Sequence, residues 1–483
     1  MKKRWLGFMA CVLILVQLVP ISSVQAADSE KAVDGNLFIQ STSNDFNSTD
    51  NCTDIAISGA IGDGAIVLKS GFNQGVYTSN VFSTSPFTKM VLSWDSDTPE
   101  GTSIQVEARV SSNSSEQWSD WLSWGTWGTS IKRASGNGVT DDSVAYVDVD
   151  TLVVKNGATA NKIQYRVTLN SNTTGVTPSV RLVAGALRNT LLVQDITTKF
   201  TDDSNLPTLI KDENDVPQLS QMVRDPSIAH SICSPTSIAM ILQYYGTNII
   251  PEEAAWGVYD YDYADFGNWP FNTAYASSFG YQAYVVYSTL EGLKQEIADG
   301  HPVAVSVAYK NSDNVKANLP VINGAPIEST NGHLIVVCGF TKINGVDYVI
   351  INDSAAPNDA GVRVEYRLDQ FAKAWAESGN IAYIIHEKEE SAVYGAPVSL
   401  AADLAASSGK QNEYSLKYNG DIIDISNNNV KTIMTSTDGG KTYQYITPSN
   451  KSSLAIKKSK GQSVPTEYLF ITGDGKTYST TLK

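Results

Sequence analysis

The sequence predicts a multidomain protein with an N-terminal β-sandwich, a central α+β domain and a small C-terminal β-sandwich. Residues 27–205 contain short alternating apolar runs separated by turn residues, without a helical period, which is typical of a sandwich. Residues 206–392 instead mix helical periods with apolar strands. Residues 393–483 return to short strands joined by Asp-Gly turns. A chain of 483 residues is long enough for several such domains.

Residues 1–26 have the features of a secretory signal peptide. Three basic residues at positions 2–4 precede an apolar run over residues 5–20, and Val24-Gln25-Ala26 offers a small-residue cleavage site. Cys11 lies inside the apolar run, which is the wrong place for a lipid-anchored cysteine. We therefore expect a secreted, extracellular protein of bacterial type, without a membrane anchor.

Composition excludes several classes of partner. The chain carries a formal net charge of −15, and removal of the leader makes it three charges more negative. Such an acidic protein binds nucleic acids and anionic membranes poorly. The cysteines beyond the leader are Cys52, Cys233 and Cys338, an odd number that leaves at least one free thiol. No His/Cys cluster has metal-ligand spacing, so we expect neither a metal nor a cofactor.

The N-terminal block begins with a polar stretch to about Asn51, which we expect to be a loose arm. Beyond it the predicted strands cover residues 64–69, 75–82, 88–94, 103–110, 145–154, 162–169 and 179–187.

A tryptophan repeat stands out within this block: Trp118, Trp121, Trp124 and Trp127 recur at every third residue. One interpretation is an aromatic platform that stacks on sugar rings and attaches the protein to cell-wall glycan. The other, which we favour, is a tryptophan-rich corner of the sandwich that packs inward and covers loops.

Cys233 precedes the strongest helical pattern of the central block. Ser234 and Pro235 open a helix, since proline fits a first turn, and Gly246 closes it. The partial positive charge at a helix N-terminus stabilises a thiolate, which is what a cysteine nucleophile needs. The residues that follow predict further helices opened by Pro251 and over 272–279 and 290–297, with strands over 282–287 and 302–308. The aromatic stretch Tyr259–Phe271 could line a substrate groove or form a covering loop.

His333 begins the apolar strand that continues to Phe340, and Cys338 lies deep in that run as a core thiol. The strand turns at Asn344-Gly345, a strong hairpin signal, and returns over residues 347–352. A strict two-residue turn would place Asn352 on the face of His333, whereas a longer loop with a bulge would place Asp353 there. Spacing alone leaves this choice open.

A thiol beside an imidazole supplies the groups that acyl transfer requires. Cys233 would attack a carbonyl, His333 would carry the proton to the leaving amine, and a carboxylate or amide would orient the ring. The backbone N–H of Cys233 and a side-chain donor would hold the oxyanion. Gln221, which follows Val216-Pro217, is the candidate donor, and the alternative is a solvated loop glutamine.

These landmarks resemble the C39-like branch of papain-fold cysteine peptidases. The resemblance rests on Val-Pro-x-x-x-Gln (216–221), Cys233-Ser-Pro-Thr-Ser-x-Ala-Met, Gly332-His333 and Asn352-Asp353, and it covers residues 210–390. It implies a papain-like fold with Cys233 as nucleophile, His333 as base, Asp353 as orienting residue and Gln221 as oxyanion donor. Two positions depart from the family pattern: Ser234 stands where glycine usually follows the cysteine, and Ser354 stands where proline is more common.

The sequence thus predicts a secreted cysteine peptidase that hydrolyses peptide bonds in a peptide or protein substrate. The proposed division is a signal peptide (1–26), an N-terminal β-sandwich (27–205), a peptidase domain (206–392) and a C-terminal β-module (393–483). Two alternatives stay open: a cell-wall peptide amidase, and a non-catalytic surface protein that binds peptides or glycans.

Overall fold

The computed structural model describes residues 36–48, 51–59, 63–113, 116–193, 196–209, 215–312, 318–387, 417–419, 422–424, 429–447, 453–455 and 466–482. These residues fall in one unit, Val33–Lys483. The predicted signal peptide lies outside the described residues, as does the Ala/Ser-rich stretch 394–408.

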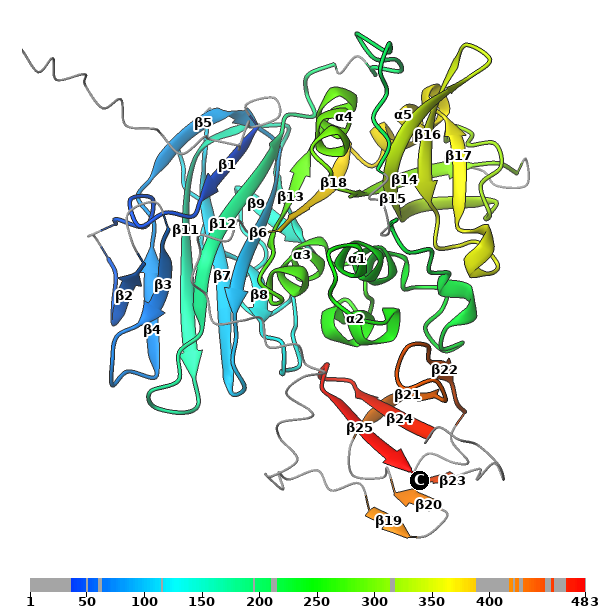
Figure 1. The fold of residues 1–483 in the computed structure, drawn as a ribbon. Coiled ribbons are helices and arrows are strands. Elements are labelled where there is room, and N and C mark those ends of the chain that lie inside the picture. Colours follow the sequence, from blue (N-terminus) through cyan, green and yellow to red (C-terminus); the bar gives the residue numbers. More distant parts are fainter. Residues whose placement is uncertain are drawn as a thin grey trace, which may run out of the picture. The chain divides into compact units, whose positions relative to one another are not determined.

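The N-terminal part consists of strands (Figure 1). They are β1 (Leu37–Gln40), β2 (Ile55–Ser58), β3 (Ala65–Leu68), β4 (Gln74–Thr78), β5 (Phe82–Phe87), β6 (Lys89–Asp97), β7 (Thr102–Ser112), β8 (Leu122–Trp127), β9 (Ala145–Asp148), β10 (Thr151–Val154), β11 (Ala160–Ser171) and β12 (Ser179–Arg188). One antiparallel sheet has the order β2-β3-β12-β6-β10-β9, with β1 also paired to β12, and the other has the order β4-β11-β7-β8, with β5 paired to β11. The prediction of a sheet-rich N-terminal domain is confirmed.

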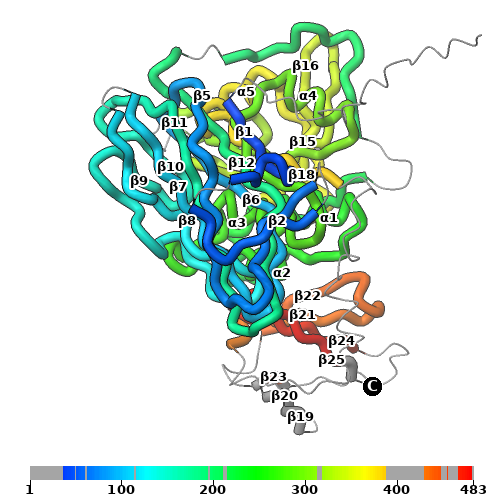
Figure 2. Tube along the Cα trace, turned by 90° about the vertical axis from the view of Figure 1, so that its left-hand side faces the viewer, coloured from blue at the N-terminus to red at the C-terminus, as the bar shows by residue number. Residues whose placement is uncertain are grey.

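The expected loose arm before Asn51 is wrong for the residues that the structure describes. Strand β1 pairs antiparallel with β12, and the two lie side by side in Figures 1 and 2. Phe46 is completely buried in the core. The few aromatic side chains of this polar stretch therefore hold it against the sheets.

The tryptophan repeat packs as the favoured interpretation expected. Trp124 and Trp127 are buried in the core. Trp118 and Trp121 are half-buried, and the Arg109 guanidinium carbon lies 4.9 Å from the centre of each ring. Arg109 thus lies between these two half-buried rings, and binding of glycan by them stays a prediction.

The central domain contains the helices α1 (Cys233–Tyr244), α2 (Pro251–Val258), α3 (Trp269–Ser277), α4 (Leu290–Ala298) and α5 (Leu368–Glu377). Its strands are β13 (Gln282–Tyr287), β14 (Val303–Lys310), β15 (Ser329–Ile343), β16 (Val346–Asn352), β17 (Arg363–Arg367) and β18 (Ile381–His386). They form an antiparallel sheet in the order β13-β18-β14-β15-β16-β17. Helix α1 contacts both α2 and α3 and also strands β14 and β15, as Figure 1 shows. This position brings its first residue to the sheet.

The N-terminal sheets and the central domain share one apolar core and several buried hydrogen bonds. The ring of Phe271 on α3 lies 5.3 Å from that of Trp127. The carboxylate of Asp95 on β6 accepts the N–H of Ala283 on β13 at 3.1 Å, and the hydroxyl of Ser93 accepts the N–H of Val285 at 3.1 Å. Strand β13 is at the edge of its sheet, so these backbone N–H groups have no partner strand there. Side chains of β6 accept their hydrogen bonds instead.

The C-terminal part contains the strands β19 (Lys417–Asn419), β20 (Ile422–Asp424), β21 (Val430–Ser436), β22 (Gln444–Tyr445), β23 (Ser453–Ala455), β24 (Thr466–Thr472) and β25 (Thr477–Leu482). They form sheets of order β19-β20-β23 and β22-β21-β24-β25. The expected strands are present, and their closure into a sandwich stays a prediction.

Candidate active site

Cys233 is the first residue of helix α1, as its sequence context predicts. The residue before it, Ile232, provides no side-chain cap, so the first-turn N–H groups keep their partial positive charge at the thiol. The Cys233 side chain is half-buried. Gly246, with a positive φ of 95°, follows the helix and supports its termination.

His333 lies on β15 and Asp353 directly follows β16, and the structure brings their side chains together. His333 Nε2 lies 2.8 Å from Asp353 Oδ1, and both residues are buried. The tight turn at Asn344-Gly345 pairs Ile343 with Val346, and the register then shifts between Val337 and Gly339. This bulge at Cys338 moves the returning strand by one residue, so that Asp353 and not Asn352 lies on the face of His333.

Asn352 has a different set of partners on the opposite face of the strand. Its Nδ2 donates to the carbonyl of Pro217 at 3.0 Å, and its Oδ1 accepts the Nε–H of Arg363 at 2.5 Å. It therefore anchors the extended segment before Gln221.

Cys233 and His333 interact electrostatically, since each shifts the pKa of the other toward its charged form. Because Nε2 of His333 is engaged by Asp353, Nδ1 is the ring atom left for the thiol. Burial opposes the charge on all three groups. In His333 burial lowers the pKa, but the Asp353 carboxylate and Cys233 raise it to about 10.

The same interactions lower the pKa values of Cys233 and Asp353. Burial raises the pKa of the Cys233 thiol, yet the hydrogen bond and charge of His333 outweigh it, and the net pKa is lowered. Burial likewise raises the pKa of Asp353, but His333 and a hydrogen bond from Tyr366 lower it overall. The net shifts of all three pKa values therefore favour the charged forms: thiolate, imidazolium and carboxylate.

Tyr366 on β17 is a site residue that sequence reasoning missed. Its hydroxyl donates to Asp353 Oδ2 at 2.7 Å, and the N–H of Ala355 donates to Oδ1 at 3.0 Å. A lone tyrosine in a short strand carries no motif, so only the pairing of β17 with β16 identifies it.

Gln221 is buried and not solvated. Its Nε2 donates to the carbonyl of Ala229 at 2.7 Å, while its Oε1 accepts the hydroxyl of Ser354 at 2.7 Å. Among the described residues, the second N–H of this amide has no hydrogen-bond partner. Ala229 lies four residues before Cys233, so these contacts tie the Gln221 amide to the loop that leads into α1.

Ser234, the departure from the family pattern, does not leave its hydroxyl at the helix mouth. The hydroxyl lies 3.0 Å from that of Tyr383 in the core, and Ser234 is completely buried. Its backbone N–H interacts with the Cys233 sulfur and helps to lower the pKa of the thiol.

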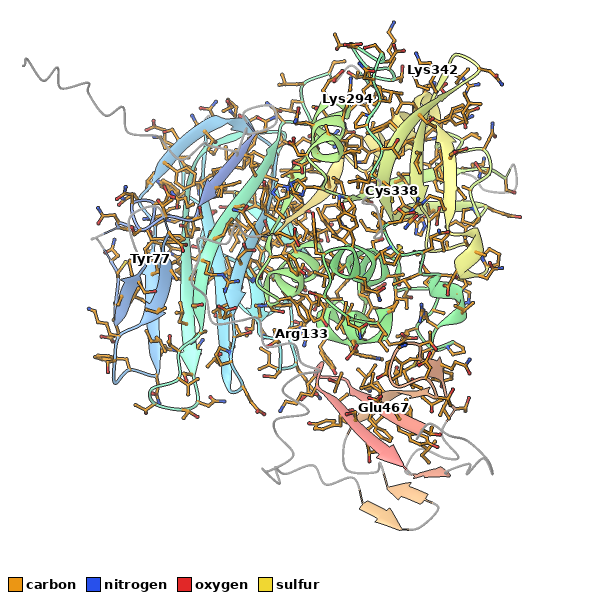
Figure 3. The ribbon with its side chains drawn as sticks, in the orientation of Figure 1. Tyr77, Arg133, Lys294, Cys338, Lys342 and Glu467 are labelled. Carbon is orange, nitrogen blue, oxygen red and sulfur yellow. The ribbon has the colours of Figure 1, made fainter. Side chains whose placement is uncertain are left out.

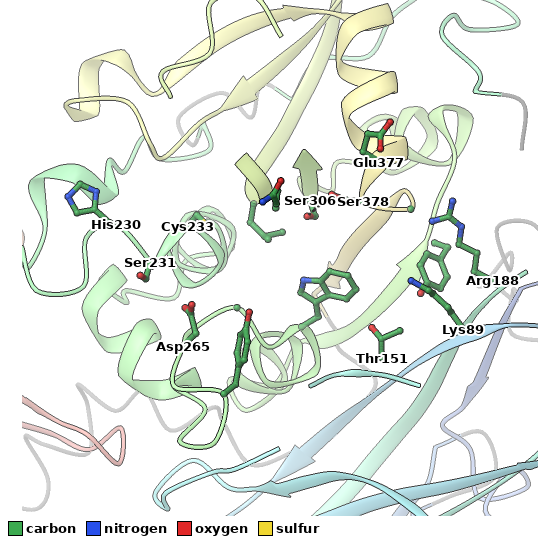
Figure 4. A pocket seen from close by; sticks show the side chains of 18 residues that line it. Lys89, Thr151, Arg188, His230, Ser231, Cys233, Asp265, Ser306, Glu377 and Ser378 are labelled. Atoms are coloured by element: carbon green, nitrogen blue, oxygen red, sulfur yellow. Dashed lines mark hydrogen bonds between the residues drawn. The ribbon is translucent and has the colours of Figure 1, made fainter. Parts of the chain in front are cut away.

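A cavity of about 470 Å³ opens beside Cys233 (Figure 4). Among its walls are four residues of the aromatic stretch: Tyr263, Asp265, Gly267 and Trp269. This stretch therefore lines a groove, one of its two expected roles. Of the four predicted site residues only Cys233 lines the cavity, and the other three are buried.

Within the described residues no group of three or more His, Cys, Asp and Glu side chains is arranged to hold a metal ion. In the same part of the chain, no helix has the length and apolar character needed to span a bilayer. Cys52, Cys233 and Cys338 form no disulfide with one another.

Two segments of the chain match known protein families. Residues 213–383 match the Peptidase_C39 like family, and residues 35–187 match the Peptidase C39 N-terminal domain. The central domain is thus C39-like, as its motifs predict. This assignment implies a cysteine peptidase, which acts on a peptide or protein substrate.

Solved structures give more distant similarities. A double glycine motif protease from an AMS/PCAT transporter, in complex with the leader peptide, is 17% identical, with 38% of this chain and 100% of that chain covered and a TM-score of 0.21. A structure concerned with the mite allergens Blo t 1 and Der p 1 is 14% identical over 37% of this chain and 74% of that chain, with a TM-score of 0.23. Carbohydrate-binding modules from the β-sandwich superfamily give 14% identity over 30% of this chain and 55% of that chain, with a TM-score of 0.15. TM-scores of this size carry no argument about function. No curated protein matches the chain at a significant level.

Proposed function

We propose that the chain is a secreted cysteine peptidase with a papain-like central domain, in which Cys233 is the nucleophile and His333 the base. Asp353 orients the imidazole, and Gln221 donates to the oxyanion. The observation that carries the proposal is the buried His333–Asp353 pair together with Cys233, whose pKa His333 lowers and which is the member of the three that lines a cavity.

The chemistry follows from this order of groups. The Cys233 thiolate attacks the carbonyl carbon of the scissile bond, and the negative charge moves to the carbonyl oxygen. The Nδ1–H of His333 then gives its proton to the leaving amine, which departs and leaves a thioester. A water molecule, deprotonated by His333, attacks the thioester and releases the acid and the thiolate.

We assign the oxyanion hole to two N–H groups. The backbone N–H of Cys233 makes no hydrogen bond among the described residues, as expected for the first residue of a helix. The second Nε2–H of Gln221 is the other donor. Such preorganised donors act on the charge that develops in the transition state.

The proposal includes the export and the division of the chain. The leader over residues 1–26 directs secretion, and the N-terminal domain (27–205), the peptidase domain (206–392) and the C-terminal module (393–483) follow it. No metal or cofactor takes part in the steps above.

The test is hydrolysis of a peptide pool. The pool is a tryptic digest of a denatured proteome with blocked N-termini, and new termini are read by mass spectrometry. The chain without its leader should create new termini, and Cys233→Ala should reduce their rate of formation by at least about 10³-fold. His333→Ala should do the same while both variants keep the wild-type thermal unfolding profile. Equal rates for the wild type and Cys233→Ala, or no cleavage at all, would contradict the proposal.

A further inference from the structure

The cavity beside Cys233 extends beyond the central domain, and strands of the N-terminal sheets form its other end. Lys89 at the start of β6, Thr151 at the start of β10 and Arg188 at the end of β12 line it together with Cys233. Figure 4 shows Cys233 at one end of the lining residues and Lys89 and Arg188 at the other.

Strand pairing and buried hydrogen bonds hold this end in place. Lys89 and Arg188 are direct partners in the β6–β12 register, so their side chains lie on the same face. The carboxylate of Asp150, next to Thr151, accepts the N–H of Trp269 at 3.0 Å across the two domains. Trp269 itself lines the cavity, so the two walls are joined directly.

The Arg188 guanidinium is positioned by the central domain. Its central carbon lies 5.9 Å from the ring centre of Tyr287. Gly379, with φ +75°, leaves the space for it, because a Cβ at this position would lie 2.0 Å from the Arg188 Nη1. A side chain at position 379 would displace the guanidinium, and the positive φ also favours glycine there.

The charges of the lining residues differ between the two ends. Lys89 is half-buried, and its ammonium group has no ion pair or hydrogen bond among the described residues. Asp265 belongs to the Cys233 end, where its Oδ1 accepts the N–H of Phe266 at 2.6 Å. Glu377, at the end of α5, is exposed and forms no ion pair within the described part of the chain. The lining of the end away from Cys233 therefore includes two cationic side chains, Lys89 and Arg188, and one exposed carboxylate, Glu377.

We infer that the N-terminal domain completes the substrate cleft and that Lys89 and Arg188 select substrates with a carboxylate at one position. This inference rests on the proposed peptidase function and names the substrate class of the same cavity. A carboxylate placed there replaces water around a half-buried ammonium group and gains charge-assisted hydrogen bonds. Because strand pairing holds Lys89 beside Arg188 and Cys233 marks the reacting bond, the preferred acidic residue lies at one position relative to that bond.

The experiment uses the full chain without its leader and the peptide pool described above. The frequency of Asp and Glu at each position around the cleaved bonds is compared with that of Asn and Gln. The variants are Lys89→Met, which removes the charge, and Lys89→Arg, the matched control that keeps it. Glu377→Gln removes the competing carboxylate.

We expect roughly a tenfold preference for the acidic residue at one position in the wild type. Lys89→Met should reduce it to near parity, Lys89→Arg should retain it, and Glu377→Gln should increase it. Added salt should weaken it, since the contact is electrostatic. Cleavage without any acidic preference, or a preference that persists in Lys89→Met, would overturn the inference.

A second experiment measures peptide binding independently of catalysis. Immobilised Cys233→Ala chain is exposed to the same pool, and to a pool with amidated C-termini, and bound peptides are sequenced. Retention of Asp- and Glu-containing peptides from both pools identifies a side-chain carboxylate, whereas loss on amidation identifies the substrate C-terminus. Acid-selective binding without cleavage by the wild type would support the inference and contradict the peptidase. No acid-selective binding, together with no cleavage, would overturn both.

Discussion

Asp353 is completely buried, yet its carboxylate keeps a lowered pKa because donors surround it. His333 Nε2, the Tyr366 hydroxyl and the Ala355 N–H lie 2.8, 2.7 and 3.0 Å from its oxygens. A buried carboxylate without such donors would instead take up a proton. In the proposed mechanism this arrangement fixes which nitrogen of His333 faces the sulfur and stabilises the imidazolium.

Removal of the Asp353 charge should therefore impair catalysis more than removal of one of its donors. We expect Asp353→Asn to lower kcat/KM by about 10²- to 10⁴-fold. Tyr366→Phe, which removes one hydrogen bond, should lower it by roughly tenfold. Steady-state kinetics on a cleaved peptide from the pool would measure both.

Tyr348→Phe is the matched control, because Tyr348 lies on the adjacent strand β16 and its hydroxyl has no hydrogen bond among the described residues. Tyr366 is a positioning residue, so its variant should also raise the pH at which Cys233 becomes a thiolate. A Tyr366→Phe variant with unchanged kinetics and an unchanged Cys233 titration would contradict this role.

At the scale of elements, strand β15 sets the geometry of the site through its bulge at Cys338. The segment before the central domain also pairs there: the N–H of Leu209 donates to the Cys338 carbonyl at 3.0 Å, and the N–H of Phe340 donates to the Pro207 carbonyl at 2.9 Å. Gly339 lies between these bonds, opposite Thr208. The bulge thus determines the register of β16 and also attaches the incoming chain.

Gly339→Ala should destabilise the protein, because its Cβ would lie 2.9 Å from the Cα of Thr208. Backbone atoms cannot move aside as a flexible side chain can, so we expect a loss of about 1–3 kcal/mol in the free energy of unfolding. Denaturant unfolding followed by fluorescence measures it. Gly332→Ala on the same strand is the control, since its Cβ would have only Ser306 Oγ nearby, at 3.9 Å. Equal stabilities of the two variants would contradict the role of the bulge.

Local patterns in the sequence were sufficient to predict most elements of the fold. Strand β13 and the start of helix α1 lie where the local sequence predicts them. Local sequence failed to predict the structure where contacts with distant segments determine it. Strand β1 has a polar neighbourhood that predicts coil, but its pairing with β12 orders it. Helix α3 begins at Trp269, three residues earlier than predicted, because the side chain of Asn268 caps it.

The candidate site was predictable only in part for the same reason. The position of Cys233 follows from a helix start, as predicted. The sequence predicts that His333 begins its strand, but β15 already begins at Ser329, because residues 329 and 330 pair with β14. The choice between Asn352 and Asp353 depends on the bulge at Cys338, and the residue types there do not predict a bulge. Lys89 lies 144 residues before Cys233 (233 − 89) and Arg188 lies 45 residues before it (233 − 188), and both belong to strands of the N-terminal sheets, so spacing could not associate them with Cys233.

At the scale of the whole molecule, Arg133 joins all three parts of the chain (Figure 3). It is completely buried, and its guanidinium donates to the carbonyls of Gly128 at 3.3 Å, Trp256 at 2.7 Å and Asp474 at 3.1 Å. Burial lowers the pKa of Arg133 to about 10, so the group stays charged at neutral pH. These acceptors come from the N-terminal domain, helix α2 and the turn between strands β24 and β25.

Arg133→Met should leave these buried carbonyls without their donor. We expect a loss of roughly 2–4 kcal/mol in the free energy of unfolding, because each unsatisfied buried group is costly. Thermal or denaturant unfolding would measure the change. Lys132→Met, at the exposed neighbouring position, should change stability little. If Arg133→Met is as stable as Lys132→Met, Arg133 does not join the three parts.

The central claim is that His333 holds Cys233 as a thiolate, and the pH dependence of Cys233 alkylation tests it most directly. A thiol reacts with iodoacetamide only as the thiolate, so the reaction rate rises with pH through the thiol pKa. Mass spectrometry of the Cys233 peptide separates its rate from those of Cys52 and Cys338. The account predicts a midpoint below the ordinary thiol value of 9.0 in the wild type. It also predicts an upward shift in His333→Ala, because the imidazolium that lowers the pKa is gone. A wild-type midpoint at or above 9.0, unchanged in His333→Ala, would contradict the account.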